Sequence, residues 1–242
     1  MKNVEILFES DSCIVVNKPA GLAVQGGEGV KTSLDSLLAE IRNPSPLLVH
    51  RLDKDTSGVL LAAKGREAAA RFSQIFGGSD KGNAKRKAVK IYTAVCKGCP
   101  EKKEGVIREE LRIKGILKKS ETRYKVIKTA KINLTEKKPN ESGSLSADTA
   151  INTASFDISS IEYSVLEIEL GTGRMHQIRR HLAMTGNPIL GDDKYGDFKL
   201  NKFLYKAVGL KRLLLHASRL IVKGEFDIDA TAPLPESFNL YC

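Results

Sequence analysis

Strand-like segments dominate this sequence, and they do not alternate regularly with helices. Short apolar runs typical of buried strands occupy residues 13–17 and 58–64, and residues 163–170 alternate apolar and polar side chains as a half-buried strand does. Further strand-like stretches cover residues 90–96, 106–117, 123–129 and 213–222. A parallel α/β fold would need a helix after each strand. The pattern therefore predicts a mixed α+β sheet protein, with residues 1–242 forming a single domain.

Helices are predicted at three places. Residues 33–42 carry leucines at helical spacing behind a Thr-Ser cap, and residues 66–76 form an alanine-rich stretch that ends at two glycines. A third helix is expected to begin at Thr172 and to end near Gly186. Residues 133–149 are polar and nearly free of apolar side chains, so we expect an exposed, flexible loop there.

The positive charge is concentrated in one quarter of the chain, a segment that we call the basic block (residues 78–138). It holds 19 Lys and Arg against 7 Asp and Glu, a net charge of +12, whereas the rest of the chain has a net charge of −2. Such a block can be a solvated face, but this imbalance favours a polyanionic partner. The block lacks an amphipathic helix with aromatic anchors, so nucleic acid is favoured over a membrane surface.

Other broad classes fit the sequence poorly. The four cysteines are too few for a disulfide scaffold, and residues 96–99 have the spacing of only half a zinc site. The glycines of residues 26–29 lack the Gly-Lys-Ser/Thr of a phosphate loop. No long apolar run and no signal peptide pattern are present, which predicts a cytoplasmic protein.

Residues 50–58 (His-Arg-Leu-Asp-Lys-Asp-Thr-Ser-Gly) form a dense polar segment between two apolar runs. A polar loop held between core strands is a place where a scaffold can present a reactive group. Asp55 fits a simple turn role. Asp53 lies outside that turn pattern, and from spacing alone it could serve catalysis or an ion pair equally well. A glycosidase-like pair of Asp53 with Asp55 also stays open.

Residues 171–182 form the second polar segment whose side chains could take part in catalysis or binding. On a helix, Met175, Ile178 and Leu182 would make one narrow apolar face, with Arg174 and Arg179 at its two borders. A half-buried guanidinium needs an acceptor, either a carboxylate or a backbone carbonyl. The same helical arrangement places His176 and Arg180 on the opposite side. No His-Glu-x-x-His pattern accompanies them, which argues against a zinc hydrolase.

These segments resemble the motifs of the RluA-type pseudouridine synthases, in the order in which that family has them. Residues 50–53 with 56–58 resemble its catalytic loop, and residues 172–179 resemble its Arg-containing motif. Residues 17–21, 90–95, 186–192 and 215–220 are similar to its remaining motifs.

The resemblance implies an α+β fold with a bent, mixed, mainly antiparallel β-sheet, flanked by helices and crossed by an RNA-binding cleft. It implies an enzyme that isomerises uridine to pseudouridine without a cofactor or a metal. Asp53 would then be the catalytic nucleophile or base, Arg179 its basic partner, and Tyr92 the ring that packs on the target base. Arg51 would fill the gap left by a flipped nucleotide.

The expected partner is a structured ribosomal or transfer RNA, bound by a monomer that lacks the N-terminal RNA-binding module of many relatives. An inactive RNA-binding protein on the same scaffold is the alternative. The residues expected to contact RNA, from these motifs and from the basic block, are His50, Arg51, Arg174, Lys85, Arg86 and Lys87.

Overall fold

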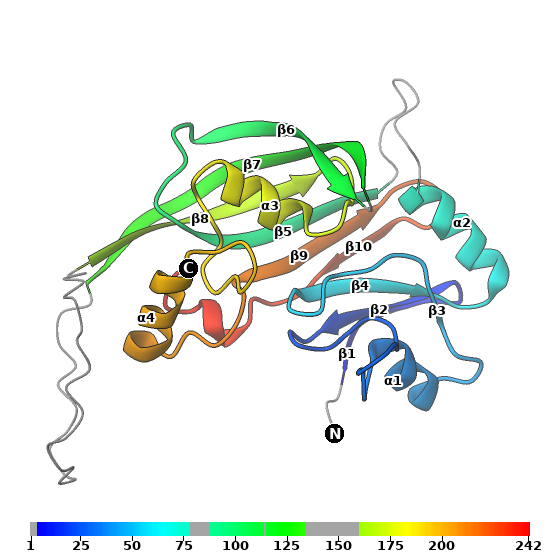
Figure 1. The fold of residues 1–242 in the computed structure, drawn as a ribbon. Coiled ribbons are helices and arrows are strands. Elements are labelled where there is room, and N and C mark those ends of the chain that lie inside the picture. The colour runs from blue at the N-terminus through cyan, green and yellow to red at the C-terminus, as the bar shows by residue number, and fades with distance from the viewer. Residues whose placement is uncertain (1–3, 78–87, 114, 134–159) are drawn as a thin grey trace, which may run out of the picture.

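The computed structural model describes residues 4–77, 88–113, 115–133 and 160–242, and its framework is one mixed β-sheet (Figure 1). Ten strands of the described residues pair in the order β1-β2-β4-β9-β5-β8-β7-β6, with β3 paired to β4 and β10 paired to β9. All pairs are antiparallel except that of β4 with β9. This sheet confirms the predicted α+β class. The strands are β1 (Glu5–Glu9), β2 (Cys13–Lys18), β3 (Leu47–Leu48), β4 (Ser57–Ala63), β5 (Ala88–Lys97), β6 (Glu104–Ile113), β7 (Ile116–Asn133), β8 (Ser160–Leu170), β9 (Leu215–Val222) and β10 (Ile228–Thr231).

Four helices and one short 3₁₀ helix flank the sheet. They are α1 (Leu34–Ile41), α2 (Arg66–Gly77), α3 (Gln177–Met184), α4 (Phe198–Val208) and η1 (Glu236–Phe238). Helix α3 crosses the strands β5, β7 and β8 in the view of Figure 1. None of the helices in the described part of the chain has the length and apolar character to cross a membrane.

The central strands are buried on both faces, which explains why their sequences read as continuous apolar runs. In β2, Ile14 and Val16 join the core cluster that contains the buried apolar residues of α1, α3 and α4. Cys13 and Val15 point to the other face, into a second cluster that includes Phe72 of α2. One side of the sheet is therefore covered by three helices, and the other side mainly by α2.

The parallel pairing of β4 with β9 needs a glycine at the point of contact. Gly58 has φ 113° and pairs with Ala217, and a Cβ atom at Gly58 would overlap the carbonyl of Ala217. This parallel contact joins the two halves of the sheet. It also fixes the strand that begins immediately after the polar segment 50–56.

Two predicted element boundaries are wrong. The stretch 106–117 is not one strand but part of a hairpin, because β6 ends at Ile113 and β7 begins at Ile116. The third helix begins at Gln177 rather than near Thr172, because His176 adopts a left-handed conformation with φ 52° that interrupts the helical pattern. The predicted polar loop 133–149 lies outside the described residues apart from Asn133, and so do Lys85, Arg86 and Lys87.

Candidate active site

Asp53 lies in the loop that connects β3 to β4, and this loop is anchored from below by a buried lysine. The ammonium group of Lys18, at the end of β2, donates to the carbonyls of Pro19, Leu22 and Lys54 at 2.9, 2.8 and 3.0 Å. The amide of Gly21 donates to the same Lys54 carbonyl at 2.9 Å. A lysine with no exposed surface is tolerable only when its donors are satisfied in this way. The turn after β2 thereby holds the backbone next to Asp53.

The other end of the loop is held by a chain of buried polar groups. Arg212 donates to Ser57 Oγ at 2.7 Å, and Ser57 Oγ lies 2.8 Å from Nδ1 of His216. Nε2 of His216 lies 3.4 Å from the carbonyl of Ala232, which can only accept, so the neutral ring carries its proton on Nε2 and the hydroxyl of Ser57 donates to Nδ1. Burial lowers the pKa of His216 to about 4, so this imidazole is neutral at pH 7.

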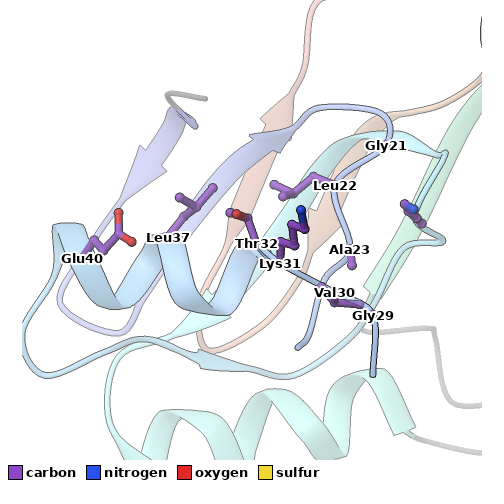
Figure 2. Close-up of a pocket in the computed structure, with 10 residues that line it drawn as sticks. Gly21, Leu22, Ala23, Gly29, Val30, Lys31, Thr32, Leu37 and Glu40 are labelled. Atoms are coloured by element: carbon purple, nitrogen blue, oxygen red, sulfur yellow. The ribbon is translucent and has the colours of Figure 1, made fainter. Parts of the chain in front are cut away.

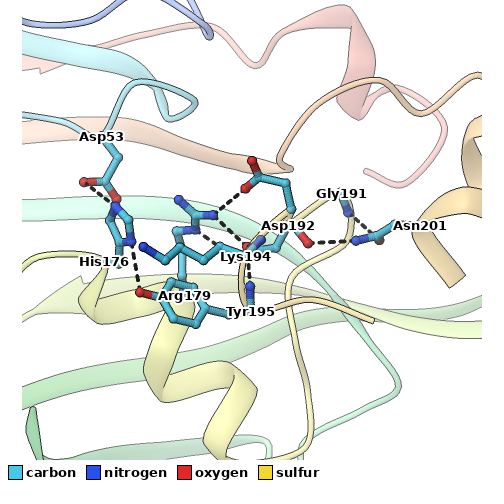
Figure 3. Close-up of polar contacts among 9 residues, drawn as sticks. Asp53, His176, Arg179, Gly191, Asp192, Lys194, Tyr195 and Asn201 are labelled. Carbon is cyan, nitrogen blue, oxygen red and sulfur yellow. Dashed lines mark hydrogen bonds and ion pairs between the residues drawn. The ribbon is translucent and has the colours of Figure 1, made fainter. Parts of the chain in front are cut away.

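The carboxylate of Asp53 faces the imidazole of His176 (Figure 3). Its Oδ1 lies 3.8 Å from Nε2 of His176, and the two side chains are 22% and 19% exposed. On its other side, His176 Nδ1 lies 3.1 Å from the hydroxyl of Tyr195. Burial lowers the pKa of His176, and the charge of Asp53 opposes that shift. The sequence prediction placed His176 on the far side of a helix, and the left-handed backbone at this residue makes that prediction wrong.

Arg179 forms its ion pairs with two other carboxylates, Asp192 and Asp193. It binds Asp192 through two parallel hydrogen bonds of 2.8 and 2.7 Å, and Asp193 through one of 2.8 Å. The resemblance implies that Arg179 is the basic partner of Asp53, but in this structure Arg179 makes its ion pairs with Asp192 and Asp193 and has no hydrogen bond to Asp53. Burial tends to lower the pKa of Arg179, but the hydrogen bond and charge of Asp192, followed by the charges of Asp53 and Asp193, raise it. The guanidinium thus acts on Asp53 only through space.

Asp192 was not among the predicted site residues, yet it organises the segment after α3. Its side chain is 1% exposed, and it accepts from the amides of Lys194 and Tyr195 at 2.9 Å each. Asn201 donates to its carbonyl at 2.9 Å and accepts from the amide of Gly191 at 2.9 Å. Figure 3 shows this cluster beside His176. The available signal was its place in the run 186–192, which resembles a family motif.

Tyr92 reaches the same region from β5. It is 6% exposed, and burial together with the nearby charge of Asp53 raises the pKa of its phenol. The phenol therefore keeps its proton at neutral pH. The sequence prediction that Tyr92 and Asp53 act at one place is consistent with this proximity.

The three described residues that were predicted to contact RNA lie in different environments. Arg51 is exposed, immediately before the buried Leu52. Arg174 is also exposed, and its side chain donates to the carbonyl of Lys119 at 3.5 Å. His50 instead points into the protein, where its Nε2 accepts from the amide of Leu61 at 3.0 Å. These contacts favour a structural role for His50.

Helix α3 is attached to β7 by hydrogen bonds that the sequence did not reveal. The buried imidazole of His181 lies 2.9 Å from the hydroxyls of both Ser120 and Thr122. Gln177 donates to the carbonyl of Glu121 at 2.8 Å and to Thr122 at 3.0 Å. A prediction from apolar spacing assigns polar residues to the exposed side of a helix, so it misses polar residues that are buried against a strand.

A pocket of about 660 Å³ lies between the turn after β2 and α1 (Figure 2), and Asp53 does not line it. Among the residues that surround it is Lys54, the neighbour of Asp53 in sequence. The others are Gly21, Leu22, Ala23, Gly29, Val30, Lys31, Thr32, Leu37 and Glu40.

Comparison with known proteins places this arrangement in one family. Residues 12–184 match the family model described as RNA pseudouridylate synthase. The chain is 32% identical over 252 residues to ribosomal large subunit pseudouridine synthase C of Rickettsia bellii, covering 97% of this chain and 69% of that protein. It is 40% identical over 209 residues to RNA pseudouridine synthase 4, mitochondrial, of Arabidopsis thaliana, covering 79% of this chain and 40% of that protein.

Among solved structures, human RNA pseudouridylate synthase domain containing 4 shares the fold. Its TM-score is 0.72 at 24% identity, and the match covers 97% of this chain and 92% of that chain. The fold, the ordered motifs and the sequence matches agree, and this chain belongs to the RNA pseudouridylate synthase family.

Proposed function

We propose that this protein converts a specific uridine of a structured ribosomal or transfer RNA to pseudouridine, with Asp53 as the catalytic nucleophile or base. In this reaction the bond between N1 of the base and C1′ of the ribose breaks, the base turns, and C5 bonds to C1′. C5 loses a proton and N1 gains one, so no electrons are exchanged with a cofactor. The names of the bacterial relatives favour a ribosomal RNA of the large subunit as the substrate.

The observation that carries the proposal is the contrast between two neighbouring carboxylates. Asp192 is buried and its oxygens are occupied by Arg179 and by backbone amides. Asp53 is partly exposed. Among the described residues, its carboxylate accepts no hydrogen bond, and its polar contact is with His176 at 3.8 Å. Its oxygens are therefore available to a substrate. The guanidinium of Arg179 supplies a positive charge near this carboxylate.

We further propose that the target nucleotide leaves the RNA stack to reach Asp53. A base inside a stem is inaccessible to a side chain, and flipping it costs a few kcal/mol. The exposed Arg51, two residues before Asp53, is suitably placed to fill the vacated position. The buried ring of Tyr92 would pack on the flipped base.

The test is the Asp53→Asn variant, with Asp55→Asn as its matched control. Release of tritium from RNA labelled at C5 of uridine reports turnover. We expect Asp53→Asn to lose about 100-fold or more of kcat, in the range typical of an essential acid or base, while RNA affinity is kept. Asp55→Asn should stay close to the parent.

Each alternative has its own outcome. Equal losses in both variants would favour a pair of cooperating carboxylates, as in a glycosidase. RNA binding by the parent without any tritium release would favour an inactive RNA-binding protein. Loss of activity in EDTA would indicate a metal-dependent reaction, which we do not expect.

A further inference from the structure

The removal of the proton from C5 needs a base, and the proposed function does not yet assign one. After C5 has bonded to C1′, this carbon carries both the ribose and its original hydrogen. The product forms only when that hydrogen leaves as a proton. If Asp53 acts as the nucleophile of the proposed function, its carboxylate is released when C5 bonds to C1′, and a second group at the site can then take the proton from C5.

Three described side chains interact with the carboxylate of Asp53: Tyr92, Arg179 and His176. The phenol of Tyr92 has a raised pKa and holds its own proton. The guanidinium of Arg179 has a raised pKa and is bound to two carboxylates. Neither can accept a proton at neutral pH. His176 is the member of the three whose ordinary pKa lies near neutrality.

The surroundings of His176 suit a group that changes its protonation state. The hydroxyl of Tyr195, 3.1 Å from Nδ1, can donate or accept a hydrogen bond, so the imidazole can carry its proton on either nitrogen. The ring of Tyr195 also packs edge-on against the imidazole, with centroids 5.6 Å apart. Nε2 is left facing the carboxylate of Asp53, where a substrate would lie.

The charges around His176 are balanced. Asp53 and Asp192 favour the protonated imidazole, whereas Arg179 and Lys194 oppose it. Burial of the ring is the largest influence and lowers its pKa, so the free enzyme holds a neutral imidazole with a lone pair available for a proton.

The backbone at His176 also fixes the direction of its side chain. The residue adopts φ 52° and ψ 30° immediately before α3, a conformation that a non-glycine residue enters at a cost of about 1–2 kcal/mol. Continuing the helix through this residue would avoid the cost. The strained turn instead aims the ring at Asp53 (Figure 3).

We propose that His176 is a catalytic base that accepts, at Nε2, the proton leaving C5 of the isomerised uracil. In this step the C5–H bond breaks, its electron pair restores the C5=C6 double bond, and the electrons of the N1=C6 double bond of the intermediate return to N1. Meanwhile N1, which kept the electron pair of the broken glycosidic bond, takes a proton from water. The imidazolium then returns its proton to water, so the reaction has no net proton change. The proposal rests on the proposed function, because it needs a uridine that has already been rejoined at C5.

The decisive variant is His176→Gly. Glycine adopts the left-handed conformation without strain, so the fold is expected to survive, and the missing ring leaves room for free imidazole. RNA carrying uridine or 5-deuteriouridine at the target position is the substrate, and product formation is followed by mass spectrometry of the digested RNA. RNA affinity and the thermal midpoint are measured on the same samples.

We expect the variant to bind RNA as the parent does and to lose about 100-fold or more of kcat, the usual contribution of a general base. Deuterium at C5 should slow the variant more than it slows the parent, because proton removal becomes rate-limiting. Added imidazole should restore part of the rate.

Several results would overturn the proposal. A kcat within about threefold of the parent would exclude His176 as the base. A large loss that is equal for hydrogen and deuterium, and that imidazole does not restore, would assign His176 a positioning role only. A parent that converts neither RNA would overturn the proposed function together with this inference, whereas an active parent confines any failure to His176.

Discussion

At the scale of single residues, the fate of Arg179 shows what a pattern can establish. Apolar spacing places Arg174 and Arg179 alike at the border of the buried face, where a half-buried guanidinium needs an acceptor, yet only Arg179 is buried. The spacing contains no information on which carboxylate accepts the hydrogen bonds of Arg179, because Asp192 lies in a loop 13 residues later. The resemblance suggested Asp53, and the structure gives Asp192 and Asp193 instead.

The pair of Arg179 and Asp192 predicts a strong difference between two adjacent aspartates. Asp192→Asn leaves a guanidinium that is 3% exposed without its main counter-charge, and we expect the free energy of unfolding to fall by about 3 kcal/mol. Asp193→Asn, at a side chain that is 79% exposed, should change it by less than about 0.5 kcal/mol. Urea unfolding at pH 7 measures both. Similar values for the two variants would show that the buried pair contributes no more than a surface contact.

His216 predicts a dependence of stability on pH. Its pKa is about 4 in the folded protein and near 6.5 when the chain is unfolded, so the unfolded state binds the proton first as the pH falls. Stability is therefore complete above pH 6.5 and declines toward pH 4, by about 3 kcal/mol for a shift of this size. His216→Asn should lower the stability at pH 7 but flatten this decline, as measured by urea unfolding between pH 4.5 and 7.5. An unchanged pH slope would mean that His216 is not the titrating group.

At the scale of elements, the sequence predicts most strands and the first two helices well. The apolar residues of these elements follow a regular period, because each element buries one or both of its faces. The two wrong boundaries occur where a backbone with positive φ interrupts an otherwise regular pattern, whereas α4, β1 and β10 were not predicted. Gly115, with φ 82°, turns the chain between β6 and β7 inside an apolar stretch. His176 does the same before α3, and a histidine is only a weak sequence signal for that conformation, which few non-glycine residues adopt.

The close pairing of β4 with β9 predicts that alanine substitutions at two glycines lower the stability by different amounts. In Gly58→Ala the new methyl group overlaps the backbone of Ala217 and meets a φ of 113°, so we expect a loss of about 3 to 5 kcal/mol in the free energy of unfolding. Gly65→Ala is the matched control, because Gly65 has φ 87° but open space around it, and it should lose about 1 to 2 kcal/mol. Urea unfolding compares the two. Equal losses of stability in the two variants would attribute the whole effect to backbone strain and none to the contact between β4 and β9.

At the scale of the whole molecule, part of the basic block is neutralised within the sheet. Arg108 and Arg123 bind Glu121 at 3.0 and 2.7 Å, and Arg123 also lies 3.3 Å from Glu169. These cations are therefore less available to an RNA than the net charge of the block suggests. Lys118 and Lys119, at the beginning of β7, are exposed and have no ion pair among the described residues. The sequence revealed the size of the basic excess, but only the strand register shows which of its charges are already compensated.

This difference selects the cations that should dock RNA. The original candidates Lys85, Arg86 and Lys87 lie outside the described residues, so the sharper test uses Lys118 and Lys119, close to Arg174 and α3. Reversing both lysines to glutamate should raise the KM for RNA and leave kcat nearly unchanged, since neither residue contacts Asp53. Each lost phosphate contact should reduce the slope of log affinity against log salt by about 0.7 to 0.9. The matched control reverses Lys202 and Lys206, which are exposed on α4 outside the basic block, and should leave the slope as in the parent. If both double variants weaken binding equally, net charge rather than a docking surface determines RNA affinity.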